Sequence, residues 1–216
     1  MNNETLTFYK NKKVYPIKVR DIVCIERRKR TIKVCMSDKT TFEFTNCSLT
    51  GIMQEVKSDR LQMCSRSAIV NRDYIYAVDP TNHYIILKEE MGTLDLGCFF
   101  REKILAGLAD QDDEFVLRID NIRYVVRLEE FLYAKSSKRI LHVFLHDGRE
   151  LRVSQKPIEY ILKQVKTETL IRCVRGVVVN REYIVKIDLK KQKLMLANGE
   201  WLDIGNGYVD LFVKKG

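Results

Sequence analysis

An arginine stands just before an apolar, strand-like run at two places in the sequence. The first phrase is CSRSAIVNRDYIYAVD, from Cys64, and the second is CVRGVVVNREYIVKID, from Cys173. A guanidinium presents a planar fork of donors that matches the O6 and N7 acceptors of guanine. The chemistry available to Arg66 and Arg175 is therefore hydrogen bonding to an anion or to a base edge. A lone arginine on a strand is usually only a solvated charge, so the repetition is what singles out this pair.

Residues that bind metals or act as nucleophiles form no recognisable set. His142 and His146 lie four apart, with no carboxylate or cysteine at metal-ligand spacing around them. No phosphate-binding loop, dinucleotide loop or nucleophile elbow is present. The sequence therefore argues against an enzyme and predicts no metal or other cofactor. The six cysteines have no CxxC spacing, and they lie at positions 24, 35, 47, 64, 98 and 173. We expect them to be free, buried thiols in a reducing compartment.

The two phrases belong to an internal repeat. Arg66 and Arg175 are 109 residues apart, and the same offset joins Asn71 with Asn180 and Tyr74 with Tyr183. Solenoids and propellers have periods of roughly 20 to 50 residues, so a longer period indicates whole domains in tandem. We expect one domain over residues 1–108 and a second over residues 109–216, joined by the polar segment 107–115.

Both halves of the chain are basic. Residues 1–110 hold 18 Lys and Arg against 14 Asp and Glu, and residues 111–216 hold 20 against 15, so the net charges of +4 and +5 sum to +9. This even distribution favours a polyanion that contacts both domains. No run approaches the roughly 18 apolar residues of a membrane helix, and the start MNNETLTFYK lacks the regions of a signal peptide. We therefore expect a cytoplasmic protein without membrane insertion.

Alternating apolar and polar residues predict a mainly β protein made of hairpins. The expected turns lie at residues 10–13, 37–39, 91–92, 120–121, 147–148 and 198–199. One principal helix is expected in each repeat. Residues 154–165 have Ser154 as an N-cap and Pro157 in the first turn, and a weaker counterpart follows Ser48. A short closing helix is expected at Ile104 and Leu105. Each domain thus contains about nine or ten short strands.

The order of these elements resembles the LytTR family of bacterial DNA-binding domains. In both repeats a hairpin precedes a segment of LEDILYIE type, which is VRDIVCIE from Val19 and RLEEFLYA from Arg127. A basic loop, a further hairpin, a helix and the R-S-x-x-V-N phrase follow. The resemblance covers about residues 4–105 and 114–212. It implies two tandem elongated β domains that place loops, not a helix, in the major groove of double-stranded DNA.

The resemblance also implies which residues contact DNA. In each copy these are the loop after the LYIE-type strand and the residue before the small one in R-S-x-x-V-N. Donors at both places suit phosphate oxygens or guanine edges. The full set implied is Arg27, Arg28, Lys29, Arg30, Ser65, Arg66, Ser67, Arg101, Lys135, Lys138, Arg139 and Arg175.

A third family loop, just after the final strand, departs from the pattern. The positions that align with the family's basic residue are Phe99 and Gly207, and neither side chain can form the base-contacting hydrogen bond. Arg101 is the candidate substitute in the first copy, and the second copy has none. We therefore expect looser base reading by the second copy.

The other residues of the repeated phrase have simpler interpretations. The asparagines are expected to tie strands together through side-chain hydrogen bonds, and the tyrosines to lie in the core. Arg72 and Arg181 either contact phosphate or face solvent.

The expected function is that of a bacterial transcription regulator that binds, as a monomer, two half-sites in direct repeat. Linking the two domains makes the second contact intramolecular and raises its effective concentration. The rival hypothesis is a degenerate pair that acts by sequestering another regulator, or that is held by an inhibitor protein. The altered third loop favours this rival, and DNA affinity at moderate salt separates the two hypotheses.

Overall fold

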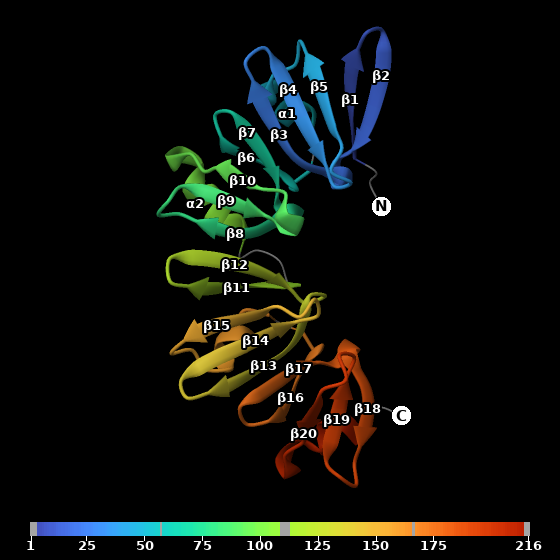
Figure 1. Cartoon of the computed structure of the whole chain (residues 1–216), viewed down its shortest axis with the longest axis vertical. Coiled ribbons are helices and arrows are strands. Elements are labelled where there is room, and N and C mark those ends of the chain that lie inside the picture. The colour runs from blue at the N-terminus through green and yellow to red at the C-terminus, as the bar shows by residue number, and fades with distance from the viewer. Residues whose placement is uncertain (1–3, 57, 109–112, 166, 214–216) are drawn as a thin grey trace. The chain divides into compact units, whose positions relative to one another are not determined.

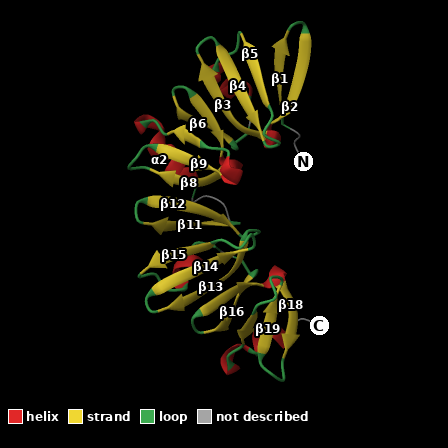
Figure 2. Ribbon diagram, viewed as in Figure 1, coloured by secondary structure: helices red, strands yellow, loops and turns green. Residues whose placement is uncertain are grey.

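The computed structural model describes residues 4–56, 58–108, 113–165 and 167–213. The chain forms two compact units, the first of residues 1–108 with 121–123 and the second of residues 109–120 with 124–216. Short antiparallel strands make up most of both units (Figure 1 and Figure 2). The mainly β fold class that the sequence predicts is thereby confirmed. The predicted junction falls partly on residues 109–112, which lie outside the described residues.

The described residues of the first unit form ten strands and two α-helices. The strands are β1 (Thr5–Lys10), β2 (Lys13–Lys18), β3 (Ile22–Arg28), β4 (Thr31–Met36), β5 (Thr41–Thr45), β6 (Leu61–Ser65), β7 (Ala68–Asn71), β8 (Ile75–Asp79), β9 (Tyr84–Leu87) and β10 (Thr93–Asp95). The helices are α1 (Leu49–Glu55) and α2 (Cys98–Gly107). Strands β1 and β2 pair as a hairpin, a central sheet has the order β5-β4-β3-β7-β6, and β8, β9 and β10 pair in chain order (Figure 1, blue to green).

The second unit repeats this plan in its described residues. The strands are β11 (Glu114–Ile119), β12 (Ile122–Arg127), β13 (Phe131–Ser137), β14 (Ile140–Leu145), β15 (Glu150–Ser154), β16 (Leu170–Val174), β17 (Val177–Asn180), β18 (Ile184–Asp188), β19 (Lys193–Leu196) and β20 (Trp201–Asp203). The helices are α3 (Glu159–Leu162) and α4 (Asp210–Val213). The central sheet has the matching order β15-β14-β13-β17-β16, and β18, β19 and β20 again pair in chain order.

Turn residues with positive φ close the predicted hairpins. Asn11 and Lys12 both have positive φ between β1 and β2, which is the conformation of a tight type I′ turn. Gly148 has φ of 89° between β14 and β15, where a residue without Cβ is not strained. The strand pairs therefore lie where the sequence places them.

The helices differ from the prediction. In the second unit the helix expected over residues 154–165 is present but much shorter, since α3 covers only Glu159–Leu162. Ser154 pairs with Ile140 as the last residue of β15 and is no N-cap. Gln155 then has positive φ, and the residue before Pro157 is biased away from helix. In the first unit the weaker prediction is confirmed, because Ser48 is the N-cap of α1 and its Oγ accepts a hydrogen bond from the Gly51 N–H at 3.0 Å.

The closing helix of the first unit is longer than predicted. Ile104 and Leu105 lie in it and are buried, but α2 begins at Cys98. The segment predicted as the third loop is therefore helical in the first unit. In the second unit the corresponding Asn206–Tyr208 forms a single 3-10 turn. Asn and Gly are weak helix formers, which accounts for the difference.

Apolar residues on the central sheets form the cores. In the first unit Phe8 stacks on Phe44, with ring centroids 4.5 Å apart, and α1 adds Leu49 and Ile52. In the second unit one face of the central sheet packs with α3 through residues such as Ile161, and the other face packs with β19 and β20. Full burial of such side chains contributes about 1.5–3 kcal/mol each, so these contacts fix the sheets on which the loops are mounted.

The repeated asparagines tie strands together, as predicted. Asn71 is completely buried, and its Nδ2 donates to the carbonyls of Val19 and Ile22 at 3.2 and 2.8 Å. Asn180 is equally buried and donates to the carbonyls of Leu128 and Phe131 at 2.8 and 3.0 Å. The two tyrosines are only half-buried, where the sequence predicts core positions. The Tyr74 hydroxyl donates to the carbonyl of Arg20, and the Tyr183 hydroxyl donates to the carbonyl of Glu129. The repeated phrase thus forms the same hydrogen bonds between strands in both units.

The six cysteines are free thiols. Cys24, Cys64 and Cys173 are buried as predicted, whereas the prediction is wrong for Cys98, which is exposed on α2. Cys24 lies directly opposite Cys35 on β3 and β4. In the second unit the corresponding positions hold Tyr133 and Phe144, whose rings stack 4.4 Å apart. No helix in the described part of the chain is long and apolar enough to cross a membrane.

Candidate nucleic-acid interface

Three chain segments of the first unit meet at one place. The Arg27 N–H donates to the carbonyl of Ser67 at 2.8 Å, which joins the end of β3 to the turn between β6 and β7. The Gly97 N–H donates to the carbonyl of Cys64 at 2.8 Å, which joins the start of α2 to β6. The first loop, the arginine turn and the third segment, which are far apart in the sequence, therefore lie side by side.

The first loop contributes an exposed run of positive charge. Arg27 and Arg28 end β3, and Lys29 and Arg30 form the turn to β4, with all four side chains exposed. Lys29 has φ of 55° in this turn. The Arg28 guanidinium is the exception among them, because it donates twice to Oε2 of Glu26, at 2.6 and 3.0 Å. Charges on an exposed hairpin end can reach phosphates without distorting the sheet.

The turn between β6 and β7 presents Arg66. Its side chain is exposed, while the neighbouring Ser65 is only 7% exposed. Ser65 Oγ accepts from the Ser67 N–H at 3.2 Å and lies 3.1 Å from Ser67 Oγ. Ser65 is thus used to shape the turn. Ser67 is exposed and is the serine placed to meet a ligand.

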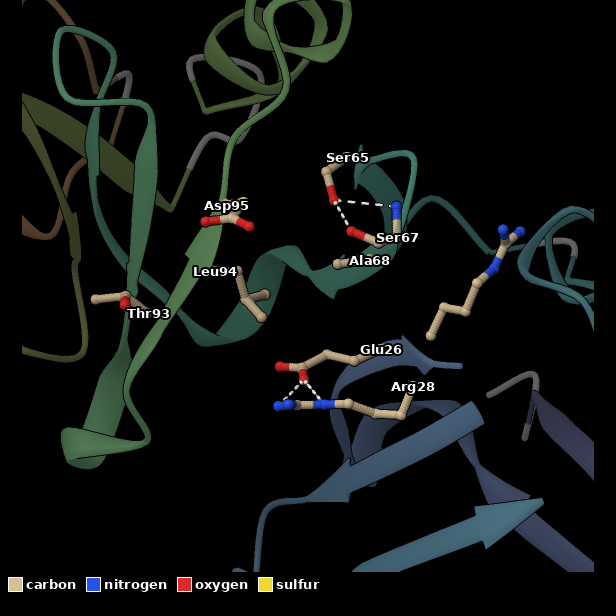
Figure 3. Close-up of a pocket in the computed structure, with 9 residues that line it drawn as sticks. Glu26, Arg28, Ser65, Ser67, Ala68, Thr93, Leu94 and Asp95 are labelled. Atoms are coloured by element: carbon tan, nitrogen blue, oxygen red, sulfur yellow. Dashed lines mark hydrogen bonds and ion pairs between the residues drawn. The ribbon is translucent and has the colours of Figure 1, made fainter. Parts of the chain in front are cut away.

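A hollow of about 300 Å³ lies between these segments and β10 (Figure 3). Arg27, Ser67 and residues of β10 line it, and the lining includes two carboxylates, those of Glu26 and Asp95. The ion pair of Glu26 with Arg28 and the Ser65–Ser67 contact are drawn as dashed lines in Figure 3. The hollow therefore offers acceptors as well as donors. Carboxylates are suited to the exocyclic amine of cytosine and repel phosphate.

The third segment places an aromatic ring beside the arginine. Phe99, in the first turn of α2, is 85% exposed, and the Arg66 guanidinium carbon lies 5.8 Å from the centre of its ring. Arg101, the predicted substitute for the missing basic residue, donates instead to Oε1 of its neighbour Glu102 at 3.0 Å. Sequence reasoning treated Phe99 only as a lost hydrogen-bond donor. The sequence carries no local signal that places this ring beside Arg66.

The same backbone contacts recur in the second unit. The Ser136 N–H donates to the carbonyl of Gly176 at 2.8 Å, and the Gly205 N–H donates to the carbonyl of Cys173 at 2.7 Å. Arg175 is exposed on the turn between β16 and β17, and it makes no ion pair or ring contact with any described residue. The predicted loop residues Lys138 and Arg139 form an exposed turn in which both have positive φ.

Lys135 differs from the other predicted residues of its loop. It is half-buried, and its ammonium nitrogen lies 5.2 Å from the centre of the Phe144 ring. On the same row of paired strands His142 faces Lys135 on one side and Arg152 on the other. The first unit has Glu26, Lys33 and Glu43 at the corresponding positions. This sheet face is therefore more positive in the second unit, which the sequence shows only once the strand register is known.

The carboxylate of Glu150 lies beside this positive row and contacts two of its members. Arg152 donates to it from Nε and Nη2 at 2.9 Å each, and His142 Nδ1 lies 2.6 Å from its Oε1. These hydrogen bonds, first from the arginine and then from the histidine, lower the pKa of Glu150 to about 2. His146 instead lies beside the Tyr183 ring, with centroids 5.1 Å apart. The two histidines have different partners and do not form one site.

A β scaffold that gathers exposed arginines and lysines where three chain segments meet is typical of a domain that binds DNA through loops. A family model described as the LytTr DNA-binding domain matches residues 12–94 and again residues 121–216. The chain therefore belongs to the LytTR family, and it contains two copies of this DNA-binding domain of transcription regulators.

Comparison with individual proteins adds little beyond the family. Among solved structures, a LytTr DNA-binding domain from Bacillus cereus is 19% identical, over 48% of this chain and 96% of its own length, with a TM-score of 0.40. No curated protein matches the chain. The arrangement of residues in the two interfaces must therefore be interpreted from this structure itself.

Proposed function

We propose that each of the two domains, residues 1–108 and 109–216, reads one half-site of a direct repeat in double-stranded DNA. The chain acts as a monomer on this DNA, in the cytoplasm. The observation that carries the proposal is the duplicated set of backbone hydrogen bonds, Arg27 to Ser67 with Gly97 to Cys64 and Ser136 to Gly176 with Gly205 to Cys173. Both copies thereby keep the same three segments together.

The arginine of each turn is the base-reading residue in this proposal. Arg66 and Arg175 are exposed and are held on tight turns between paired strands. A guanidinium can donate to both O6 and N7 of guanine, which is the commonest specific contact to a base. Neither arginine is engaged in an ion pair with a described carboxylate, so neither must break one to reach DNA.

Six of the remaining predicted residues contact the backbone of DNA in this proposal. Exposed cations on the β3–β4 and β13–β14 turns are suited to phosphates, because such contacts position a protein without reading sequence. Ser67 adds a hydroxyl beside Arg66, and Gly176 has none in the second copy. We assign backbone contacts to Arg27, Lys29, Arg30, Ser67, Lys138 and Arg139.

Four predicted residues are less available for a direct contact with DNA. Ser65 is nearly buried within its turn, Arg28 is paired with Glu26, and Arg101 is paired with Glu102. Lys135 is held against the Phe144 ring. We propose that these side chains support the exposed contacts or join them after rearranging.

The first experiment tests the paired half-sites. Sites are selected from random DNA with the full chain, and the affinity is measured after inserting about 5 base pairs, half a helical turn, between the halves. We expect half-site centres near 10 or 21 base pairs apart, with insertion sharply weakening binding, since one domain is then on the wrong side of the duplex. An inserted full turn is the control. Indifference to the half turn contradicts the two-domain model.

The second experiment separates the residues that read bases from those that contact the DNA backbone. Arg66→Ala is expected to cost about 1–3 kcal/mol and to relax base preference in one half-site, and Arg175→Ala is expected to do so in the other. Replacing Lys29 and Arg30 with Gln is expected to weaken all sequences alike and to reduce the salt slope by about one for each lost contact. If the wild-type chain shows no DNA affinity at moderate salt, the sequestration hypothesis replaces this one.

A further inference from the structure

Phe99 is the most exposed large apolar side chain of the described residues, at 85%. A single exposed apolar side chain is common on protein surfaces, so the position of this ring beside Arg66 matters more than its exposure. The ring lies within cation–π range of the Arg66 guanidinium, 5.8 Å away. Its place is also fixed, because the Gly97 N–H is bonded to the carbonyl of Cys64 two residues before Arg66.

The second copy provides a natural comparison. Gly205 makes the same hydrogen bond to Cys173 as Gly97 makes to Cys64. The aromatic ring that follows each glycine is also retained, since a Cβ on Gly97 would lie 3.1 Å from Phe100 and one on Gly205 would lie 3.3 Å from Tyr208. The position of Phe99, the residue beside Arg66, is occupied by Gly207 in the second copy. A Cβ at Gly207 would meet open space.

We propose that Phe99 is a specificity-determining residue of the first domain, which orients Arg66 and contacts the C5-methyl group of a thymine next to the guanine that Arg66 reads. The inference rests on the proposed function. The ring limits the positions that the guanidinium samples, and its exposed edge offers an apolar surface of the kind that contacts thymine methyls in the major groove. The second domain lacks both effects, and so reads its half-site with less discrimination.

The proposed contact with thymine can be tested by removing a single methyl group from the DNA. Sites are selected with wild type and with Phe99→Ala, and the thymine whose enrichment disappears in the variant is identified. Uracil, which differs from thymine only by the missing methyl, is then placed at that position. We expect uracil to weaken binding of the wild type about fourfold, the value of one buried methylene-sized group, and to leave Phe99→Ala unaffected.

Two further variants separate the two effects of the ring. Phe99→Leu keeps an apolar contact but has no π-face, so it should retain the uracil effect and lose about two- to fivefold of the preference for guanine. Gly207→Phe should add a uracil effect to the second half-site, where the wild type has none. Thermal unfolding of each variant serves as the control for folding, since both positions are on the surface.

The outcomes distinguish this inference from the function on which it rests. Specific binding by wild type with no selected thymine, or with no response to uracil, overturns the role of Phe99 and leaves the two-half-site function intact. Unchanged guanine preference in Phe99→Leu overturns the orienting role of the ring. Absence of sequence-specific binding by the wild type overturns the proposed function, and this inference with it.

Discussion

Replacing the buried Asn180 with Ala should destabilise the second domain more than replacing a polar residue on its surface or in its turns. Asn180 is completely buried, and its side chain makes three hydrogen bonds. Its Nδ2 satisfies the carbonyls of Leu128 and Phe131, and its Oδ1 accepts from the Glu182 N–H at 3.0 Å. Alanine leaves all three backbone groups without this partner.

The magnitude follows from the number of groups that lose their partner. A buried backbone group without a hydrogen bond costs about 1–3 kcal/mol. Water can reach the Glu182 N–H more easily than the two carbonyls, since Glu182 is exposed. We therefore expect a loss of roughly 3 kcal/mol for Asn180→Ala, at the low end of that range for each group. A domain of this size is usually stable by about 5–15 kcal/mol, so the variant should still fold.

The assay is equilibrium unfolding in urea. Trp201 is the single tryptophan of the sequence and lies in β20, so its fluorescence reports on the second domain. The matched control is Asn198→Ala, which removes one exposed hydrogen bond to the Glu200 N–H and should cost under about 1 kcal/mol. Equal effects of the two substitutions would refute the view that the repeated asparagine holds the strands together.

Three further predictions concern groups outside the proposed DNA contacts. Ser48→Ala should cost about 1 kcal/mol by removing the cap of α1, whereas Ser154→Ala, in a strand, should cost much less, as urea unfolding can show. Glu150 has its pKa lowered from 4.5 to about 2 by the arginine and histidine beside it, so its stabilising effect is complete above pH 4.5 and is lost as the pH falls toward 2. The stability difference between wild type and Glu150→Gln should therefore close over that interval. A hydrogen bond from its cross-strand partner Cys24 lowers the pKa of Cys35 to about 7, while burial raises that of Cys64 to about 12; alkylation followed by mass spectrometry should therefore modify Cys35 at a lower pH than the buried Cys64.

The hairpins could be predicted because their signals are local. Alternation with a period of two and a turn residue such as Asn11 or Gly148 lie within about fifteen neighbouring residues. The same holds for the buried asparagines, since the repeat marked them and a polar residue in an apolar strand needs a partner. These features require no knowledge of which strands lie next to each other.

The helices show where local signals fail. Residues 154–165 carry a helical apolar pattern, and Ile158 and Ile161 are indeed buried. The pairing of Ser154 with Ile140 and the restraint before Pro157 shorten the helix from its start. The apolar pattern correctly predicts which residues are buried, but strand pairing at Ser154 overrides it at the start of the helix.

The meeting of the three segments could not be derived from spacing. Arg27 and Ser67 are joined because β3 pairs with β7, and the sequence between them gives no sign of that pairing. The resemblance to a known family supplied the three segments, and the structure supplied their contacts. Neither composition nor periodicity indicated that a phenylalanine ring would lie beside Arg66.

The two copies share the same internal hydrogen bonds but differ in the residues at the proposed DNA interface. This difference predicts that the two half-sites in DNA form an imperfect direct repeat. The asparagines, the tyrosines and the glycine contacts recur with the same partners. At the interface, by contrast, Glu26 and Phe99 of the first copy correspond to Lys135 and Gly207 of the second. A carboxylate can accept from cytosine and an ammonium cannot, so the base pairs beside the two guanines should differ. Selection from random DNA should return half-sites in the same orientation with a shared guanine and different flanking bases. If the two selected half-sites are identical and Glu26→Lys leaves them so, these positions do not take part in reading.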